Sequence, residues 1–296
     1  MTMEPQAAML PDGRRLHLNH GPIDLIVEAF GPEEERAAAY AQATERFRTI
    51  LTELVGELPA LRSASGAVPR SFRGTTARRM EAAVSPLAAD EFITPMAAVA
   101  GSVADEVLVA LTAGRRLKKA YVNNGGDIAL FLAGGQSLTL AVAGTGNGFA
   151  DRATIRAEDA VRGVATSGWR GRSFSLGIAD AVTVLARSAA AADAAATLIA
   201  NAVDLPGHPA VTRLPARDLA PDSDLGDRPV TQGVGPLSPR DIATALRRGF
   251  ERAESLRRHG LILSAALFLA GESRICGLIA PAEPTTTMPG RIPVHA

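Results

Sequence analysis

The chain has 296 residues, of which 47% are hydrophobic and 21% are charged, and these values exclude an intrinsically disordered protein. The 31 lysines and arginines balance the 31 aspartates and glutamates, so no excess of positive charge draws the chain to nucleic acid or to an anionic membrane. Cys276 is the single cysteine, which excludes an intrachain disulfide and a cysteine-rich metal site.

The N-terminal third of the chain predicts one strand and three helices. Residues 24–30 are typical of a strand, and Gly31-Pro32 followed by Glu33-Glu34-Glu35 starts a helix that ends near Leu58. After a connection over 59–69, two further helices are expected at 75–84 and 95–111. The chain begins without a basic segment followed by an apolar one, which favours a cytoplasmic protein over a secreted one.

Short strands are expected in the middle of the chain, at 120–122, 128–132, 137–143, 153–156, 162–166 and 182–186. Glycine and asparagine turns between them predict an antiparallel meander. An alanine-rich helix follows over 188–203, then a loop rich in Pro, Gly and Asp over about 205–237, a helix from Ser238 to about Leu256, and a buried strand within Leu261–Ala270. The ten residues of this last segment are too few to cross a membrane, since a spanning helix needs about 20.

These elements predict one α+β domain over residues 1–296, with an antiparallel sheet and flanking helices. Several common catalytic motifs are absent from the sequence, among them the phosphate loop, the Gly-x-Ser-x-Gly elbow and histidine pairs with zinc-ligand spacing. The run Gly144-Thr145-Gly146-Asn147-Gly148 looks like a nucleotide fingerprint, but Phe149 occupies the sixth position, so a plain turn is the simpler interpretation.

Three short blocks combine residues suited to a cation or a phosphate. Asp193 and Thr197 are four residues apart, so they share one face of the predicted helix, and their oxygens suit Mg²⁺. The block Asn123-Asn124-Gly125-Gly126-Asp127 allows close backbone approach at its glycines and offers a carboxylate. Thr166-Ser167-Gly168 ends a strand with hydroxyl and N–H groups. Taken alone, each block is more simply a turn or a solvated helix face.

In their order and spacing the three blocks resemble the ApbE-like superfamily, whose best-known members are FAD:protein FMN transferases. That family shows Asn-x-Gly-Gly-Asp, then Ala-Thr-Ser-Gly, then Ala-Asp-x-x-x-Thr on a helix. A weaker match is Gly101-Ser102-Val103-Ala104-Asp105, which resembles the family's Lys-Gly-x-x-x-Asp segment. The resemblance covers about residues 94–203 and is nearest to a short, functionally uncharacterised branch of the superfamily.

The resemblance implies an ApbE-like fold and a site for FAD with Mg²⁺. The implied metal ligands are Asp193, Thr197 and a main-chain carbonyl within residues 96–100. The residues implied to bind the cofactor are Asp105, Gly125, Gly126, Asp127, Thr166, Ser167 and Gly168. In such an enzyme the metal assists the departure of AMP, while a threonine hydroxyl on an acceptor protein takes FMN.

The chain also departs from the family pattern. Ala100 stands where the family usually has lysine, and the His-x-x-x-Pro-x-Thr-Gly segment is missing after Gly168. Arg170 and Arg172 follow instead, either as replacements for the lost charge or as exposed loop residues. Three functions therefore remain open: a Mg²⁺-dependent flavin-nucleotide enzyme, a flavin or nucleotide binding module without transferase activity, and a protein of this fold that binds another small molecule.

Overall fold

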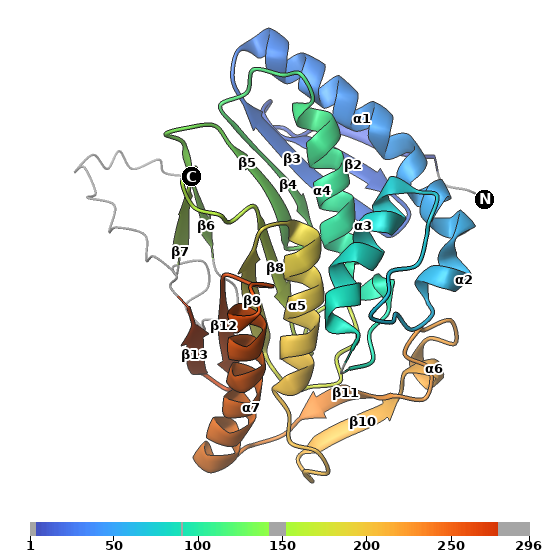
Figure 1. The fold of residues 1–296 in the computed structure, drawn as a ribbon, viewed down its shortest axis with the longest axis vertical. Coiled ribbons are helices and arrows are strands. Elements are labelled where there is room, and N and C mark those ends of the chain that lie inside the picture. The colour runs from blue at the N-terminus through green and yellow to red at the C-terminus, as the bar shows by residue number, and fades with distance from the viewer. Residues whose placement is uncertain (1–3, 90, 142–151, 278–296) are drawn as a thin grey trace, which may run out of the picture.

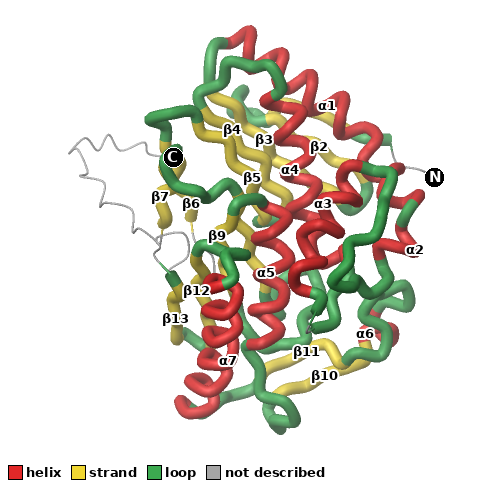
Figure 2. The backbone as a smooth tube through the Cα atoms, viewed as in Figure 1, coloured by secondary structure: helices red, strands yellow, loops and turns green. Residues whose placement is uncertain are grey.

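The computed structural model describes residues 4–89, 91–141 and 152–277. A nine-stranded sheet runs through them in the order β1-β2-β3-β4-β5-β8-β9-β12-β13, and every neighbouring pair in it is antiparallel. Helices α1, α3, α4, α5 and α7 lie together over one face of this sheet (Figure 1 and Figure 2). The predicted class, an antiparallel sheet with flanking helices, is confirmed.

The strands of the main sheet are short. Their bounds are Gln6–Met9 (β1), Leu16–His20 (β2), Ile23–Phe30 (β3), Lys119–Asn124 (β4), Asp127–Leu132 (β5), Gly163–Ser167 (β8), Ala181–Ala186 (β9), Ser264–Leu269 (β12) and Glu272–Cys276 (β13). Of these, β1, β2 and β13 were not predicted. The two edge strands, β1 and β13, have side chains that are exposed along nearly their whole length, so no apolar alternation marks them in the sequence.

Among the described residues, five helices begin and end close to the predicted bounds and two short ones, α2 and α6, were not predicted. They are Glu33–Gly56 (α1), Leu58–Leu61 (α2), Thr75–Val84 (α3), Val99–Thr112 (α4), Ala189–Ala202 (α5), Ala216–Leu219 (α6) and Pro239–Arg258 (α7), with 3₁₀ turns at Ser85–Leu87 (η1) and Pro95–Ala98 (η2). Side chains fix two of the starts: Ser188 accepts a hydrogen bond from the N–H of Ala191 at α5, and Ser238 forms a capping box with Asp241 at α7.

Two hydrophobic clusters join the helices to the sheet. One packs α1 and α4 against β2, β3 and β4, and the other packs α5 and α7 against β9 and β12. The segment Pro95–Thr112, which contains α4, is long and apolar enough to cross a membrane by length and composition, with a mean hydropathy of 1.4. Its position between α1 and α5 accounts for that apolar character, because a buried helix of a globular core passes the same test.

The predicted meander is wrong at its centre. Strands β6 (Ser137–Ala141) and β7 (Arg152–Arg156) pair only with each other among the described strands, so β5 pairs directly with β8. Leu138 and Leu140 of β6 pack with Leu130 and Leu132, whose side chains leave the sheet on the face opposite the helices. The alternating apolar side chains of β6 therefore pack onto the face of the main sheet, and β6 does not form hydrogen-bonded pairs with the strands of that sheet. The expected turn at 144–148 lies outside the described residues.

The segment 205–237 is not the plain loop that was predicted. It contains β10 (Val211–Pro215), α6 and β11 (Pro229–Val234), and the two strands form a small antiparallel sheet. Thr231 attaches this segment to the body: its N–H donates to the Ser175 carbonyl at 2.9 Å, and its hydroxyl donates to the Gly177 carbonyl at 2.8 Å. These partners are distant in sequence, so the Pro and Gly content could not reveal them.

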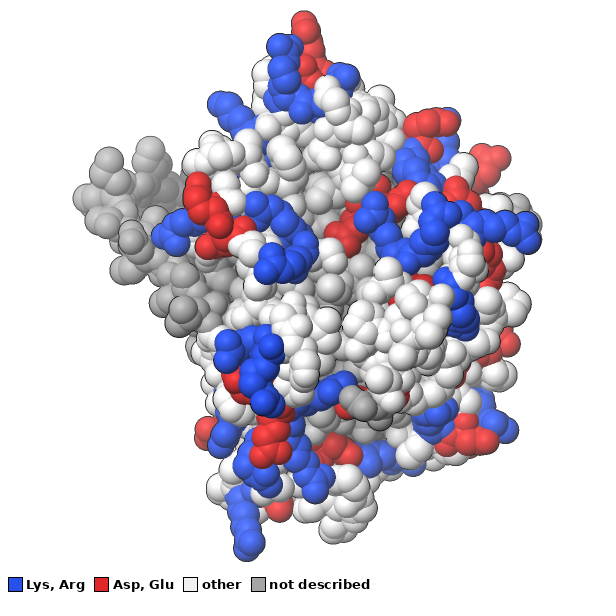
Figure 3. Space-filling view, viewed as in Figure 1, with Lys and Arg blue, Asp and Glu red and all other residues white. Residues whose placement is uncertain are grey.

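Charged groups of both signs are interspersed over the face of the molecule shown in Figure 3. On α7, for example, Arg247 pairs with Glu251 at 2.7 Å and Arg257 pairs with Glu254 at 3.0 Å. Such exposed pairs contribute little to stability, about 0–1 kcal/mol each, and they are typical of a solvated helix face.

Candidate functional site

A cavity of about 610 Å³ opens where the β4–β5 turn, the end of β8 and the N-terminal parts of α4 and α5 meet. This volume lies within the range of about 300–1,000 Å³ that is usual for small-molecule sites. The lining residues come from five segments of the chain, within 96–100, 124–127, 166–174, 193–197 and 223–225. Segments more than a hundred residues apart therefore form a single site.

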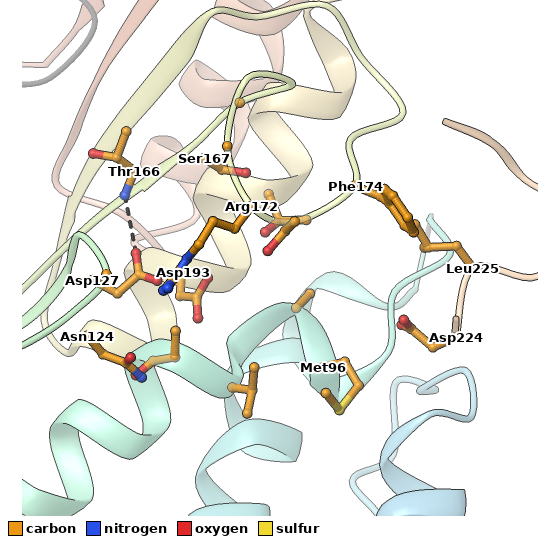
Figure 4. Close-up of a pocket in the computed structure, with 18 of the residues that line it drawn as sticks. Met96, Asn124, Asp127, Thr166, Ser167, Arg172, Phe174, Asp193, Asp224 and Leu225 are labelled. Carbon is orange, nitrogen blue, oxygen red and sulfur yellow. Dashed lines mark hydrogen bonds between the residues drawn. The ribbon is translucent and has the colours of Figure 1, made fainter. Parts of the chain in front are cut away.

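On the sheet side, the ends of two strands place Asp127 beside Thr166. Asp127 begins β5, and its Oδ1 accepts a hydrogen bond from the N–H of Thr166 at 3.3 Å (Figure 4). The preceding turn needs glycine twice, because Gly125 and Gly126 have φ values of +66° and +115°, which side chains rarely tolerate. Gly125 lines the cavity, whereas Gly126 does not and instead donates its N–H to Asn123 Oδ1 at 2.8 Å.

On the helix side, Asp193 and Thr197 lie one turn apart on α5 and both line the cavity. Asp193 Oδ2 accepts a hydrogen bond from the N–H of Gly101, near the start of α4, at 2.9 Å. The side chain of Asn124 donates to the Ala100 carbonyl at 3.1 Å, which ties the β4–β5 turn to the same helix start. The structure thus brings together most of the sequence-predicted site residues: Gly125, Asp127, Thr166, Ser167, Gly168, Asp193 and Thr197.

The two cavity carboxylates repel each other. Burial raises the pKa of Asp127 to about 7, opposed by the N–H of Thr166 and the charge of Arg172. Burial, and then the charge of Asp127, raise the pKa of Asp193 well above its usual value, opposed by the N–H groups of Gly101 and Ala100. A divalent cation would relieve this repulsion, because it favours the ionised form of both groups.

The donor set fits a hard cation such as Mg²⁺. Two carboxylates, the Thr197 hydroxyl and main-chain carbonyls are oxygen ligands, which Mg²⁺ prefers. Within the described residues no group of three or more His, Cys, Asp or Glu side chains is placed to hold a metal. A cation at this site would therefore take further ligands from the bound molecule and from water, as Mg²⁺ commonly does.

The raised pKa of Asp127 predicts a pH effect on stability. The folded protein binds this proton more tightly than the unfolded chain, whose pKa is near 3.8, so stability falls as pH rises from about 4 through about 7. Thermal unfolding without divalent cations at pH 5 and pH 8 is the measurement. We expect the wild type to lose more stability between these values than Asp127→Asn does. Equal losses in the two proteins would show that Asp127 titrates normally.

Asp105, like Gly126, is a predicted site residue that does not line the cavity. Its carboxylate, 8% exposed, accepts hydrogen bonds from the N–H groups of Ala189 at 3.1 Å and Ala190 at 2.9 Å, the first two residues of α5. Gly101, one turn earlier on α4, has no room for a Cβ, which would overlap the Ala189 carbonyl. The Gly-x-x-x-Asp spacing is thus explained by helix packing, and the structure places Asp105 at the contact between α4 and α5, outside the lining of the cavity where a cofactor-binding role was expected.

Removing the Asp105 carboxylate should therefore lower stability. In Asp105→Ala two buried N–H groups lose their acceptor, at a cost of about 1–3 kcal/mol each. We expect urea unfolding to show a total loss of about 2–4 kcal/mol. Asp218→Ala, at an exposed position of α6, is the control and should change stability by about 0.5 kcal/mol or less. If both variants unfold alike, the helix-holding role of Asp105 is wrong.

Sequence reasoning missed the cavity wall formed by the 205–237 segment. Asp224 and Leu225 line the cavity, and Asp224 Oδ2 accepts a hydrogen bond from the Thr94 hydroxyl at 2.5 Å. Close by in sequence, the Arg228 guanidinium lies 3.2 Å from the centre of the Phe92 ring. Each of these contacts joins the segment to residues 92–94, more than a hundred positions earlier, so no local pattern could have predicted them.

The structure also separates the two arginines that follow Gly168. Arg170 pairs with Asp180 at 2.8 Å and stacks over the Trp169 ring at 4.5 Å. Arg172 instead lines the cavity and points toward Asp127 and Asp193 (Figure 4). Both arginines are exposed, but only Arg172 lines the cavity, so of the two it is Arg172 that could replace the lost charge.

Comparison with known proteins shows the family of this chain through one family model. A family model described as AbpE bacteria matches residues 7–275. A UPF0280 protein of Methanopyrus kandleri is 34% identical over 170 residues, which is 57% of this chain and 66% of that protein. A UPF0280 protein of Methanothermobacter thermautotrophicus is 39% identical over 116 residues, 38% of this chain and 44% of that one. The match thus spans less than two thirds of either relative's length.

Among solved structures, the flavinyl transferase ApbE of Pseudomonas stutzeri, in its apo form, aligns over 93% of this chain and 95% of its own, with a TM-score of 0.42 and 12% identity. An ApbE protein of Thermotoga maritima aligns over 60% of this chain and 68% of its own, with a TM-score of 0.28 and 17% identity.

Proposed function

Because the chain belongs to the AbpE bacteria family, an ApbE-like family, we propose that its cavity binds FAD together with Mg²⁺ and transfers FMN to an acceptor hydroxyl, releasing AMP. The observation that carries the proposal is that two carboxylates, Asp127 and Asp193, line one cavity of a size that suits a nucleotide. Two carboxylates that share one cavity favour a ligand that binds together with a cation, because the cation stabilises their ionised forms.

The residues that would hold Mg²⁺ are Asp193 and Thr197 on α5, with a main-chain carbonyl from residues 96–100. When bound, the ion would offset the charge of the pyrophosphate and so ease the departure of AMP. Ser167 and the backbone of Gly168, at the end of β8, line the cavity and would contact the phosphate oxygens.

In the proposed transfer, the acceptor hydroxyl oxygen forms a bond to the phosphorus of the FMN half of FAD. The bond from that phosphorus to the oxygen bridging the two phosphates breaks, AMP leaves with the bridging oxygen, and the hydroxyl proton passes to solvent. The role of the chain is to orient the pyrophosphate for this displacement and to stabilise the charge on the departing phosphate. A protein carrying an exposed threonine is the proposed acceptor.

A second candidate is a binding module that holds FAD without transferring FMN. The observation that favours it is Ala100, which lines the cavity where the family pattern has lysine, so that a positive charge is missing beside the ligand. In this case the cavity would act as a carrier site.

Release of AMP tests the first candidate against the second. The purified protein is incubated with FAD, Mg²⁺ and threonine-containing acceptor peptides, and AMP is measured by chromatography with EDTA-treated samples as controls. The transferase proposal expects AMP and flavin-labelled peptide only in the presence of Mg²⁺. Binding of FAD without release of AMP from any acceptor favours the binding module, and no binding of FAD rejects both.

A further inference from the structure

One charged residue of the cavity has no role in the proposed function. Arg172 lines the cavity, and within the described part of the chain its guanidinium forms neither an ion pair nor a hydrogen bond. Its charge nevertheless acts on Asp127, since it lowers the pKa of that carboxyl against the effect of burial. An arginine that points into a cavity without a partner is available to bind an anion.

Close packing and backbone hydrogen bonds hold the turn that precedes Arg172. Gly168 packs against the backbone of Asp180 so closely that a Cβ would overlap the Asp180 carbonyl. The N–H of Trp169 donates to the Ala179 carbonyl at 3.0 Å, and the N–H of Gly171 donates to the Gly168 carbonyl at 3.1 Å. This tight turn brings the next residue, Arg172, to the mouth of the cavity (Figure 4).

Gly125 leaves the space that the guanidinium uses. A Cβ on Gly125 would overlap Nη2 of Arg172, so the guanidinium lies directly against the backbone of the β4–β5 turn. From there it faces Asp127 at the start of β5. The positive φ of Gly125 and the absence of a side chain are therefore both needed for the position of Arg172.

We infer that Arg172 binds a phosphate group of the ligand, and that in the free protein its charge partly offsets that of Asp127 without a direct ion pair. The inference deepens the proposed function and rests on it for the identity of the ligand as a phosphate compound. A guanidinium matches two phosphate oxygens with parallel N–H groups, which a point charge does not.

Two consequences follow from the shared position of Arg172 and Asp127. In the absence of a phosphate ligand, the positive charge of Arg172 repels a divalent cation, so the cation alone binds weakly. A phosphate ligand that arrives with the cation draws Arg172 away from the carboxylates, so cation and ligand strengthen each other's binding. Arg172 is thus a positioning and specificity residue for phosphate, acting opposite the metal ligands of α5.

Binding measurements on Arg172→Gln and Arg172→Lys test this, with Arg170→Gln as the matched control from the same loop. The probes are FAD with Mg²⁺ and inorganic pyrophosphate with Mg²⁺, both by calorimetry, and Mn²⁺ alone, by the loss of its free electron paramagnetic resonance signal. Arg172→Gln should bind both phosphate probes at least about tenfold more weakly, since it loses a charge-assisted hydrogen bond to the phosphate. It should bind Mn²⁺ alone more tightly than the wild type.

Arg172→Lys should restore only part of the phosphate affinity, and Arg170→Gln should match the wild type with all three probes. If the wild type binds FAD and Arg172→Gln binds it equally well, the inference is wrong while the proposed function stands. If the wild type binds pyrophosphate but not FAD, the flavin proposal fails, and Arg172 is still judged by pyrophosphate. If the wild type binds neither phosphate probe, or if Mn²⁺ binding weakens in Arg172→Gln, the inference is overturned.

Discussion

Replacing Asp193 with alanine is expected to abolish the Mg²⁺-dependent release of AMP from FAD. The variant loses the carboxylate that the cavity offers from α5, and alanine supplies no oxygen to a hard cation. Changes to residues that merely support metal ligands already cost about 10–100-fold in affinity or activity, so loss of a ligand should cost more than about 100-fold. The measurement is the initial rate of AMP formation at saturating FAD and Mg²⁺.

Asp193→Asn separates the charge from the hydrogen bond. The amide oxygen of asparagine can still accept the N–H of Gly101, whereas the negative charge is gone. We expect this variant to be as inactive as Asp193→Ala and at least as stable as the wild type, because a carboxylate that burial and Asp127 destabilise has been removed. Thr197→Ala should reduce the rate less, since a neutral hydroxyl is the weaker ligand. An Asp193→Asn protein with wild-type activity would contradict the metal role.

Replacing Gly101 with alanine is expected to cause the largest loss of stability, about 3 kcal/mol or more. The new Cβ would overlap the carbonyl of Ala189 and the N–H of Ala190, which are backbone atoms and cannot move as a flexible side chain can. Helices α4 and α5 would have to separate at the point where Asp105 holds them and where Gly101 contacts Asp193. Urea unfolding of the purified variant is the measurement.

The control for Gly101 is the last residue of another helix. Gly56 ends α1, and a Cβ there would meet no atom within 4 Å. Gly56→Ala should therefore stabilise the protein by up to about 1 kcal/mol, through the better helix propensity of alanine. If Gly101→Ala behaves like Gly56→Ala, then α4 and α5 do not approach each other as closely as described.

The fold class could be predicted because its signals are local. The apolar residues of β4 and β5, the glutamates at the start of α1 and Ser238 at the start of α7 each specify their own element. The strands β6 and β7 show the limit of such signals, since alternation predicts a strand but not the surface on which its apolar side packs. The prediction of a plain loop over 205–237 was wrong for a related reason. Thr231 attaches this segment to carbonyl groups that are distant in the sequence.

Parts of the candidate site could be predicted where one short segment of the sequence contains suitable ligand side chains at a spacing that places them together. Asp193 and Thr197 lie on one helix face by their spacing alone, and the glycines before Asp127 mark a turn. Asp105 shows what spacing cannot decide, since a carboxylate one helical turn after a glycine can bind a ligand or the start of another helix. The sequence likewise could not predict that Arg170 pairs with Asp180 while Arg172 lines the cavity, because this depends on the three-dimensional course of the backbone after Gly168.

Calorimetric titration of the wild type with FAD, in Mg²⁺ and again in EDTA, tests the central claim most directly. The account predicts one FAD per chain in Mg²⁺ and an affinity at least about tenfold weaker in EDTA, because Asp127 and Asp193 then face the pyrophosphate without a cation between them. Equal affinity under both conditions would contradict the metal site, and no binding in Mg²⁺ would contradict the flavin site itself.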